Sequence, residues 1–235
     1  MKLSVIIPVF NEEKTVGQLI KKVLAERTPK EIIVVNDGST DKTQKEIDKL
    51  KSRRLVKLSF PENQGKGTAV RAGLKKAQGE FLIIQDADLE YDPKDYSRLL
   101  KPIQEGQAKV VYGTRLKKLP LKILGKDKTP LPLHYLVNRF LSVLTNLFYG
   151  SHLTDMETGY KMISREVYSQ LKLVSNRFEI EPEITAKILK KGYPIIEVPI
   201  KTQPRGYKEG KKIKAKDALL AVFTLFKYLQ LTKIA

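Results

Sequence analysis

A regular alternation of short apolar runs and amphipathic segments constrains the fold of this chain more than any other feature. Five runs rich in Val, Ile and Leu are typical of buried parallel strands; they occupy residues 3–10, 31–37, 54–60, 80–86 and 108–115. Segments with helical periodicity separate them, and Asn11 is predicted to cap the first such helix. This order predicts an α/β fold, a doubly wound and mostly parallel sheet with right-handed crossovers. Ligands of such sheets bind beyond the carboxyl ends of the strands.

The order of elements is less regular after Arg115. A basic connector with several prolines comes first. The segments that follow predict a helix over 133–150, a loop, strand and helix start over 154–167, a helix over 179–192, a strand over 193–200, a basic loop over 201–216 and a helix over 217–231. We expect a single domain over residues 1–235, with halves 1–115 and 116–235.

Two of these later helices, 133–150 and 217–231, are strongly apolar but are interrupted by Asn138, Arg139 and Lys227. They fit amphipathic helices at the interface of an anionic membrane, or helices that pack on the sheet; for Leu136 and Val143 we predict packing. No run of about 18 apolar residues predicts a membrane-spanning helix. The first residues contain an apolar run too short for a signal peptide.

Three carboxylates stand at alternate positions where the fourth apolar run ends, in "FLIIQDADLEYDP": Asp86, Asp88 and Glu90. Like charges so close together repel, so a positive partner is expected. Oxygen ligands of this kind suit a hard divalent cation, Mg²⁺ or Mn²⁺, and we assign the positive charge to that metal. The alternative is an acidic turn that caps the following helix, which is the role predicted for Asp92.

Other types of site find less support in the sequence. "GKGT" at residues 65–68 lacks the full spacing of a phosphate-binding loop, and its glycines are predicted to allow close packing of a helix start. The chain has no cysteine and only two histidines, His134 and His152, which argues against thiolate and multi-histidine zinc sites.

The chain carries a formal net charge of +18, and the charge is concentrated. Residues 114–139 hold seven basic residues against one acidic residue, and residues 201–235 hold nine against two. Such clusters indicate phosphate ligands on a small molecule, a membrane or a nucleic acid. A nucleic-acid-binding protein is the main non-enzyme alternative. The sequence argues against it, because tryptophan is absent and stacking aromatics do not interleave with the basic clusters.

Four motifs together resemble the nucleotide-sugar domain of glycosyltransferase family 2, which has the GT-A fold: "SVIIPVFNEEKTV", "EIIVVNDGSTDKT", "NQGKGTAVRAG" and "DADLEYDP". The later segments "TDMETGYKMI", "FEIEPEITAKILKKGY" and "PRGYKEGKKI" are similar to dolichyl- or polyprenyl-phosphate hexose synthases of that family. The resemblance implies a C-terminal acceptor-side extension with amphipathic helices.

The resemblance also implies roles for individual residues. The nucleotide sugar would contact Pro8, Phe10, Glu12, Asp37, Asp86, Ala87, Asp88, Arg115, Arg205 and Lys211. The metal would be held by Asp86, Asp88 and Glu90. The acceptor phosphate would face Arg115, Arg139 and Lys212. Asp155 lies where relatives that act on hydroxyl groups place a base, so Asp155, Arg115 and Arg205 are the candidate catalytic residues.

The implied reaction is inverting transfer of a hexose, mannose in preference to glucose, from GDP-mannose or UDP-glucose to dolichyl or polyprenyl phosphate. A protein bound peripherally at the cytoplasmic face of a membrane is expected, with Mg²⁺ or Mn²⁺ as cofactor. A family-2 transferase that acts on a sugar hydroxyl is the alternative among enzymes.

Overall fold

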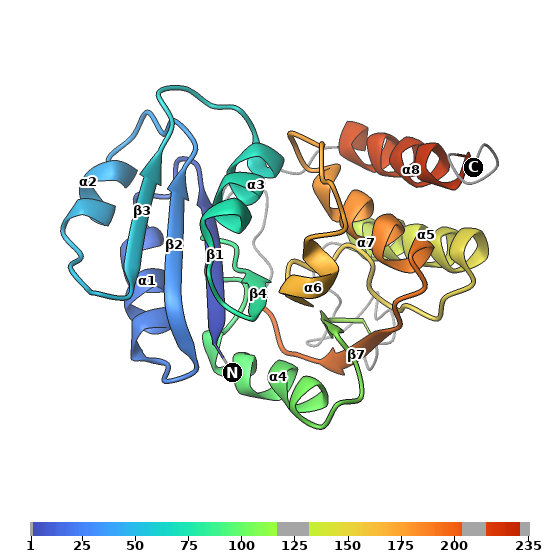
Figure 1. Ribbon diagram of the computed structural model, residues 1–235. Coiled ribbons are helices and arrows are strands. Elements are labelled where there is room, and N and C mark those ends of the chain that lie inside the picture. Colours follow the sequence, from blue (N-terminus) through green and yellow to red (C-terminus); the bar gives the residue numbers. More distant parts are fainter. Residues whose placement is uncertain (1, 117–131, 204–214, 231–235) are drawn as a thin grey trace, which may run out of the picture.

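The computed structural model describes residues 2–116, 132–203 and 215–230, and shows a seven-stranded sheet with helices on both faces (Figure 1). The strands are β1 (Leu3–Val9), β2 (Pro29–Asn36), β3 (Leu55–Ser59), β4 (Phe81–Ile84), β5 (Val110–Thr114), β6 (Lys161–Ser164) and β7 (Ile195–Pro199). The first five were predicted from the apolar runs, and β6 and β7 from the segments 154–167 and 193–200. Their spatial order is β3-β2-β1-β4-β6-β5-β7.

One strand departs from the parallel arrangement. β6 lies between β4 and β5 and is antiparallel to both, whereas β7 is parallel to β5. The prediction of a mostly parallel α/β sheet is therefore confirmed. The antiparallel strand has a consequence for the site, because its first residues lie at the edge where the parallel strands end.

The helices are α1 (Val16–Ala25), α2 (Thr43–Asp48), α3 (Lys66–Lys76), a 3-10 turn (Pro93–Asp95), α4 (Tyr96–Gln104), α5 (Pro132–Tyr149), α6 (Arg165–Tyr168), α7 (Ile180–Lys190) and α8 (Ala215–Gln230). Residues of α1, α2 and α4 pack on one face of the sheet, and residues of α3, α6 and α7 pack on the other. β1 illustrates why both faces are covered, since Val5 and Ile7 join the first core and Ile6 joins the second.

α5 and α8 form an outer layer that packs on α7, at the end of the molecule far from α2 (Figure 1). Leu141, Ala186 and Leu225 are buried in this contact. The opposite side of α5 is exposed, with Leu136 at 51% and Val143 at 60%, so the prediction that these two residues pack on the sheet is wrong. The inward positions of α5 already fill the contact with α7 and α8. None of the helices in the described part of the chain is long and apolar enough to cross a bilayer.

One edge of the sheet collects the predicted site residues. β1, β2 and β4 all end there, and the backbone N–H of Asp37 donates to the carbonyl of Val9 at 2.8 Å. The loop before β6 arrives at the same edge. The chain beyond β7 passes it too, because the N–H of Gln203 donates to the carbonyl of Glu90 at 3.0 Å.

Candidate active site

Four charged side chains form a chain of ion pairs at this edge. The ammonium of Lys66, at the start of α3, lies 2.7 Å from Oδ1 of Asp86 and 2.9 Å from Oε1 of Glu181. The other oxygen of Glu181 accepts from the fully buried ammonium of Lys161. Burial disfavours the charged form of Lys66, but Asp86 and Glu181 more than offset this and raise its pKa. Charge is thus balanced locally without any group from outside the chain.

Lys66 and Glu181 are functional candidates that sequence reasoning missed. The sequence analysis assigns the positive partner of the carboxylates to a metal, whereas the structure places a lysine beside the first of them. The glycines explain how it gets there. A Cβ on Gly67 would lie 2.4 Å from the carbonyl oxygen of Ser175, and Gly65 has a φ of +99°, so α3 can begin close to residues 175–176 only with glycine at both positions. The packing role predicted for them is confirmed, and it delivers Lys66 to Asp86.

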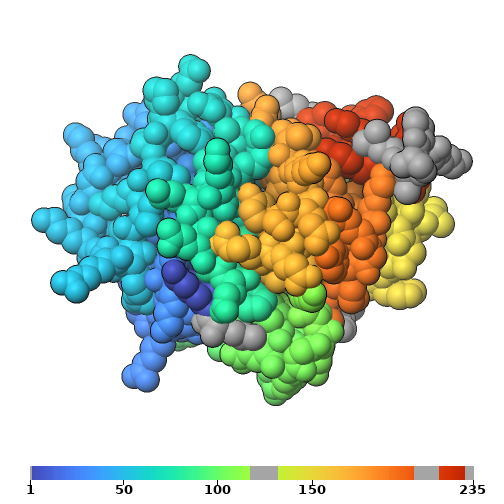
Figure 2. Space-filling view, viewed as in Figure 1, coloured from blue at the N-terminus to red at the C-terminus, as the bar shows by residue number. Residues whose placement is uncertain are grey.

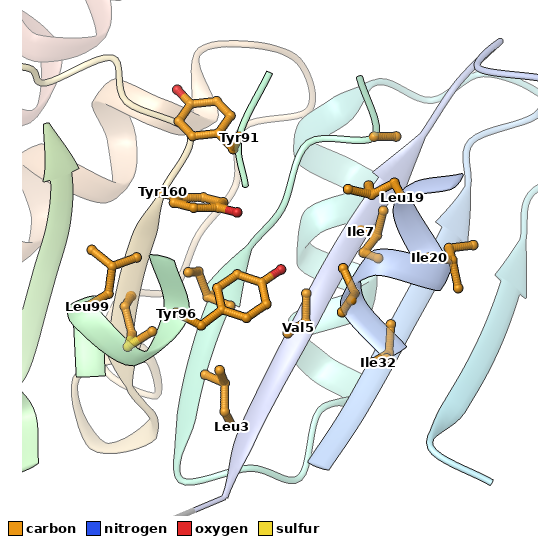
Figure 3. Packing of buried hydrophobic residues seen from close by; sticks show 14 of the residues in the cluster. Leu3, Val5, Ile7, Leu19, Ile20, Ile32, Tyr91, Tyr96, Leu99 and Tyr160 are labelled. Carbon is orange, nitrogen blue, oxygen red and sulfur yellow. The ribbon is translucent and has the colours of Figure 1, made fainter. Parts of the chain in front are cut away.

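The acidic loop, residues 85–91, is anchored by tyrosines. Tyr91 lies 4.6 Å from Tyr160 between ring centroids, and its hydroxyl accepts from the N–H of Gly159 at 2.8 Å (Figure 3). Tyr96 and Tyr160 both donate to Oε1 of Gln85, at 2.7 and 2.6 Å. These contacts fix both ends of the loop against the segment before β6.

Gly159 packs closely against the carboxylate of Asp86, since a Cβ at position 159 would lie 2.5 Å from Oδ2 of Asp86. Asp88 accepts from the N–H of Glu90 at 3.1 Å. Asp92 caps the 3-10 turn by accepting from the N–H of Lys94 at 3.1 Å, as predicted. The acids that follow β4 therefore have different local roles although they are close in sequence.

Two of the three predicted metal ligands, Asp86 and Asp88, suit a hard divalent cation. Mg²⁺ usually takes one or two protein carboxylates and completes its shell with water and phosphate oxygens. Asp86 and Asp88 offer such a pair, whereas residues 2–116, 132–203 and 215–230 contain no group of three acidic or histidine side chains gathered to hold a metal. The predicted three-residue set with Glu90 is not assembled in this structure, and its metal role stays a prediction.

A second charged pair follows β5. The guanidinium of Arg115 donates from Nε and Nη2 to the two oxygens of Asp155, both at 2.7 Å, and the backbone N–H of Arg115 adds a third bond at 2.9 Å. Asp155 is completely buried. Burial opposes the charge of Arg115, but the carboxylate outweighs it and raises the pKa further. The pair holds Arg115 in one orientation, and Nη1 takes no part in it.

Supporting contacts hold the loop that carries Asp155. Glu197 of β7 accepts from the N–H groups of Thr154 and Asp155, at 2.9 and 3.0 Å. Arg139 of α5 donates from Nη1 to the carbonyl of Thr154 at 3.4 Å. The structure therefore brings Arg139 to the loop that carries Asp155, and its role at the acceptor phosphate stays a prediction.

The residues predicted to line the nucleotide pocket also lie at this edge. Pro8 belongs to β1, Glu12 accepts from the hydroxyl of Thr15 at 2.8 Å, and Ala87 is buried. Asp37 is engaged with the chain itself: it accepts from the N–H groups of Gln64 and Gly65 at 2.8 and 2.9 Å, and burial raises its pKa.

Phe10, just beyond the end of β1, lies at this edge as well. The remaining predicted residues, Arg205, Lys211 and Lys212, lie outside the described ranges.

Comparison with known proteins agrees with this architecture. Residues 4–172 match the family model "Glycosyl transferase family 2". The chain is 30% identical over 220 residues to a UDP-N-acetylglucosamine–dolichyl-phosphate N-acetylglucosaminyltransferase of Methanococcus voltae, covering 85% of each chain.

It is also 31% identical over 206 residues to the low-salt glycan biosynthesis hexosyltransferase Agl6 of Haloferax volcanii, covering 86% of this chain and 48% of that protein. This chain therefore spans about half the length of Agl6.

Among solved structures, glucosyl-3-phosphoglycerate synthase from Mycobacterium tuberculosis, in complex with Mn²⁺, UDP and phosphoglyceric acid, superposes with a TM-score of 0.73. The match covers 97% of this chain and 78% of that one at 19% identity, which establishes a shared fold. The seven-stranded sheet and the family match lead to one conclusion: this chain is a glycosyltransferase of family 2 with the GT-A fold.

Proposed function

We propose that this glycosyltransferase transfers a hexose, mannose in preference to glucose, from a nucleotide sugar to a dolichyl or polyprenyl phosphate at a membrane surface, with inversion at the anomeric carbon. The Methanococcus voltae relative is a dolichyl-phosphate N-acetylglucosaminyltransferase by name, which supports a dolichyl-phosphate acceptor, and the hexosyltransferase Agl6 supports hexosyl transfer.

The burial of Asp155 and its pairing with Arg115 are the observation that best supports a phosphate acceptor. A transferase that acts on a sugar hydroxyl needs a base to remove its proton, whereas a phosphate is already ionised near neutral pH. Asp155 is fully buried and both of its oxygens accept from Arg115. A carboxylate committed in this way is a poor base but a good orienting group, so an acceptor that needs no base fits the site best.

The cations supply complementary binding for phosphate groups. Arg115 is held at the end of β5 by Asp155, and Arg139 reaches the neighbouring loop. Gln203, the last described residue before the basic loop, lies beside Glu90. Arg205 follows two residues later in sequence, and Lys211 and Lys212 follow soon after. We assign Arg139 and Lys212 to the acceptor phosphate, Arg205 and Lys211 to the leaving diphosphate, and Arg115 to both.

In the proposed reaction a phosphate oxygen of the acceptor attacks the anomeric carbon, and the nucleoside diphosphate leaves from the opposite face. The chain positions the acceptor through Arg115 and disperses the charge that develops on the leaving diphosphate. A divalent cation held by Asp86 and Asp88 would add Lewis-acid stabilisation of that charge when bound. Bound Mn²⁺ or Mg²⁺ in structures of the same fold supports this cofactor.

We place the donor, the nucleotide sugar GDP-mannose or UDP-glucose, at the sheet edge beside Pro8, Phe10, Glu12, Asp37 and Ala87. UDP in the structures of the same fold supports a pyrimidine donor, and the Methanococcus voltae relative is named for UDP-N-acetylglucosamine. The test must therefore include mannose and glucose donors, and both guanine and uracil nucleotides.

An exposed apolar surface supports contact with lipid. α5 and α8 pack side by side at one end of the molecule (Figure 2), and both helices expose large apolar side chains: Leu133, Leu136, Phe140, Val143 and Leu147 on α5, and Leu219, Leu220, Phe223 and Phe226 on α8. Soluble proteins rarely expose so many large apolar side chains together. The most basic stretches of the sequence flank both helices, as expected for a protein drawn peripherally to an anionic membrane such as the cytoplasmic leaflet.

The test is a transfer assay with radiolabelled GDP-mannose, UDP-glucose and UDP-N-acetylglucosamine, each offered prenyl phosphate, the corresponding neutral prenol, and simple sugars. We expect label in an organic-soluble, acid-labile product formed from prenyl phosphate only. Label on a free sugar hydroxyl, with prenyl phosphate unlabelled for every donor, would overturn the lipid-phosphate acceptor in favour of the hydroxyl-directed alternative.

A further inference from the structure

Glu157 is a half-buried acid that none of the roles above uses. It lies in the loop between Asp155 and Gly159, and its Oε1 atom is enclosed without a hydrogen-bond partner in the part of the chain that the structure describes. Buried polar atoms are nearly always bonded, because the cost of an unmade bond is high. An exception in the middle of a binding edge indicates an atom that a ligand completes.

Glu157 lies close enough to both charged groups of the site to feel their charges. Arg115 and Asp155 of one group, and Lys161 and Glu181 of the other, all shift its pKa. Removal from water, the largest effect, raises the pKa of Glu157 to about 7, and the two carboxylates add to this while the two cations oppose it. The first group belongs to the proposed acceptor side, and the second is joined through Lys66 to Asp86 on the donor side.

The Oε1 atom of Glu157 indicates which kind of ligand group would bind it. A carboxylate oxygen accepts hydrogen bonds, so it needs a donor. A phosphate ionised near neutral pH offers no proton and repels a carboxylate, and the site provides arginines and lysines for such groups. A hydroxyl both donates and accepts, so it suits a carboxylate as well as a protonated carboxyl group. Between a diphosphate on one side and a phosphate on the other, the group that carries hydroxyls is the transferred sugar.

We propose that Glu157 is a specificity-determining residue that binds a hydroxyl group of the transferred sugar. Glu157 is half-buried, but its Oε1 atom is enclosed. The segment from Thr154 to Gly159, which carries Glu157, is fixed at both ends. Glu197 holds Thr154 and Asp155, and Tyr91 holds Gly159. A side chain on such a short tethered loop can select one sugar configuration, because it cannot follow a hydroxyl that points elsewhere. The inference rests on the proposed function, since it requires a sugar donor in this cleft.

Calorimetric titration separates the sugar contribution from the nucleotide contribution. Wild type, Glu157→Ala and Glu157→Gln would be titrated with UDP and UDP-glucose, and with GDP and GDP-mannose, at saturating Mg²⁺. For the donor that wild type prefers, Glu157→Ala should weaken nucleotide-sugar binding about ten- to a hundredfold and leave binding of the nucleoside diphosphate unchanged. Glu157→Gln keeps an accepting oxygen and should lose less. Glu166→Gln, at an exposed ion pair with Lys109, serves as the matched control and should lose nothing.

The outcomes are distinct. If Glu157→Ala binds nucleotide sugar and nucleoside diphosphate as wild type does, or loses both equally, Glu157 does not bind the sugar and the inference is wrong while the proposed function stands. If wild type binds none of the nucleotide sugars, the proposed function fails and the inference fails with it. Unchanged binding of the diphosphate also shows that the variant is folded.

Discussion

The ammonium of Lys66 lies 2.7 Å from Oδ1 of Asp86, so the first acid of the acidic loop already has a cation beside it. The same ammonium contacts Glu181 of α7, and it thereby ties the loop after β4 to the opposite wall of the site. This pairing has a direct consequence for stability.

Removal of the Lys66 charge should destabilise the fold. Lys66→Met leaves Asp86 and Glu181 without their shared cation, and loss of one member of a buried ion pair costs about 3–5 kcal/mol. Urea denaturation should show a loss of about 3 kcal/mol in the free energy of unfolding. Lys75→Met, on the exposed side of the same helix, is the control and should change it by less than about 0.5 kcal/mol. Equal stability of the two variants would contradict a structural role for the pair.

Loss of Asp88 should abolish transfer without unfolding the protein. Asp88→Ala removes one of the two carboxylates proposed to hold Mg²⁺ or Mn²⁺, and added metal should not restore the rate. Asp92→Ala is the matched control, because it removes only a cap and should cost about 1 kcal/mol of stability while transfer persists. Full activity of Asp88→Ala, or of wild type in excess chelator, would refute the metal role.

Asp155 and Arg115 should act as one unit. If Asp155 orients Arg115, then Asp155→Asn and Arg115→Lys each raise KM for prenyl phosphate, and the double variant is little worse than either single one. The pH dependence of kcat should keep its shape in Asp155→Asn. Additive losses, together with a lost acidic limb in that profile, would instead identify Asp155 as a base.

Vesicle binding should depend on the apolar surface of α5 and α8. Leu147 is 77% exposed, and Leu147→Glu should reduce sedimentation with vesicles that contain anionic lipid. Gln107→Glu is the control for the added charge, since Gln107 is exposed in the turn after α4 and its replacement should have no effect. Wild-type binding should also weaken with added salt, because the Debye length is about 10 Å at 0.1 M. Equal losses in both variants would exclude a localised membrane contact.

Glu157 should make stability depend on pH. Its pKa of about 7 in the folded protein exceeds the usual value of 4.5, so the folded state binds more protons between these values, and stability falls as pH rises through this window. Glu157→Gln should remove this contribution. The free energy of unfolding of wild type relative to the variant, measured at pH 5 and pH 8, should therefore be lower at pH 8. A difference that does not change with pH would show that the carboxyl group is not buried as described.

The strands were predictable because each apolar run is long enough to be buried and is followed by a clear break. The glycines at 65 and 67 were correctly assigned to close packing. The partner of Asp86 was not predictable in the same way, because Lys66 precedes it by twenty residues and reaches it only through the α3 crossover.

Tertiary contacts also overrode local rules. Asn11 was predicted to cap α1, but Thr15 holds that position, and the Asn11 side chain accepts from the N–H of Thr40 at 2.9 Å. Asn11 thus joins two loops that meet at one edge of the sheet, although the sequence predicts it as a helix cap. The outward stripe of α5 was misassigned for a related reason, since periodicity identifies an apolar face but not what covers it.

The strand order also bears on how such enzymes can be recombined. β5 ends the first half of the chain, yet it pairs on both sides with strands from the second half, β6 and β7. A chimera joined at residue 115 would replace both strands that pair with β5, so the second half is not an independent unit of the sheet. Crossovers placed in the edge loops leave these pairings intact, so substrate preference should be transferable between relatives loop by loop, and far less readily half by half.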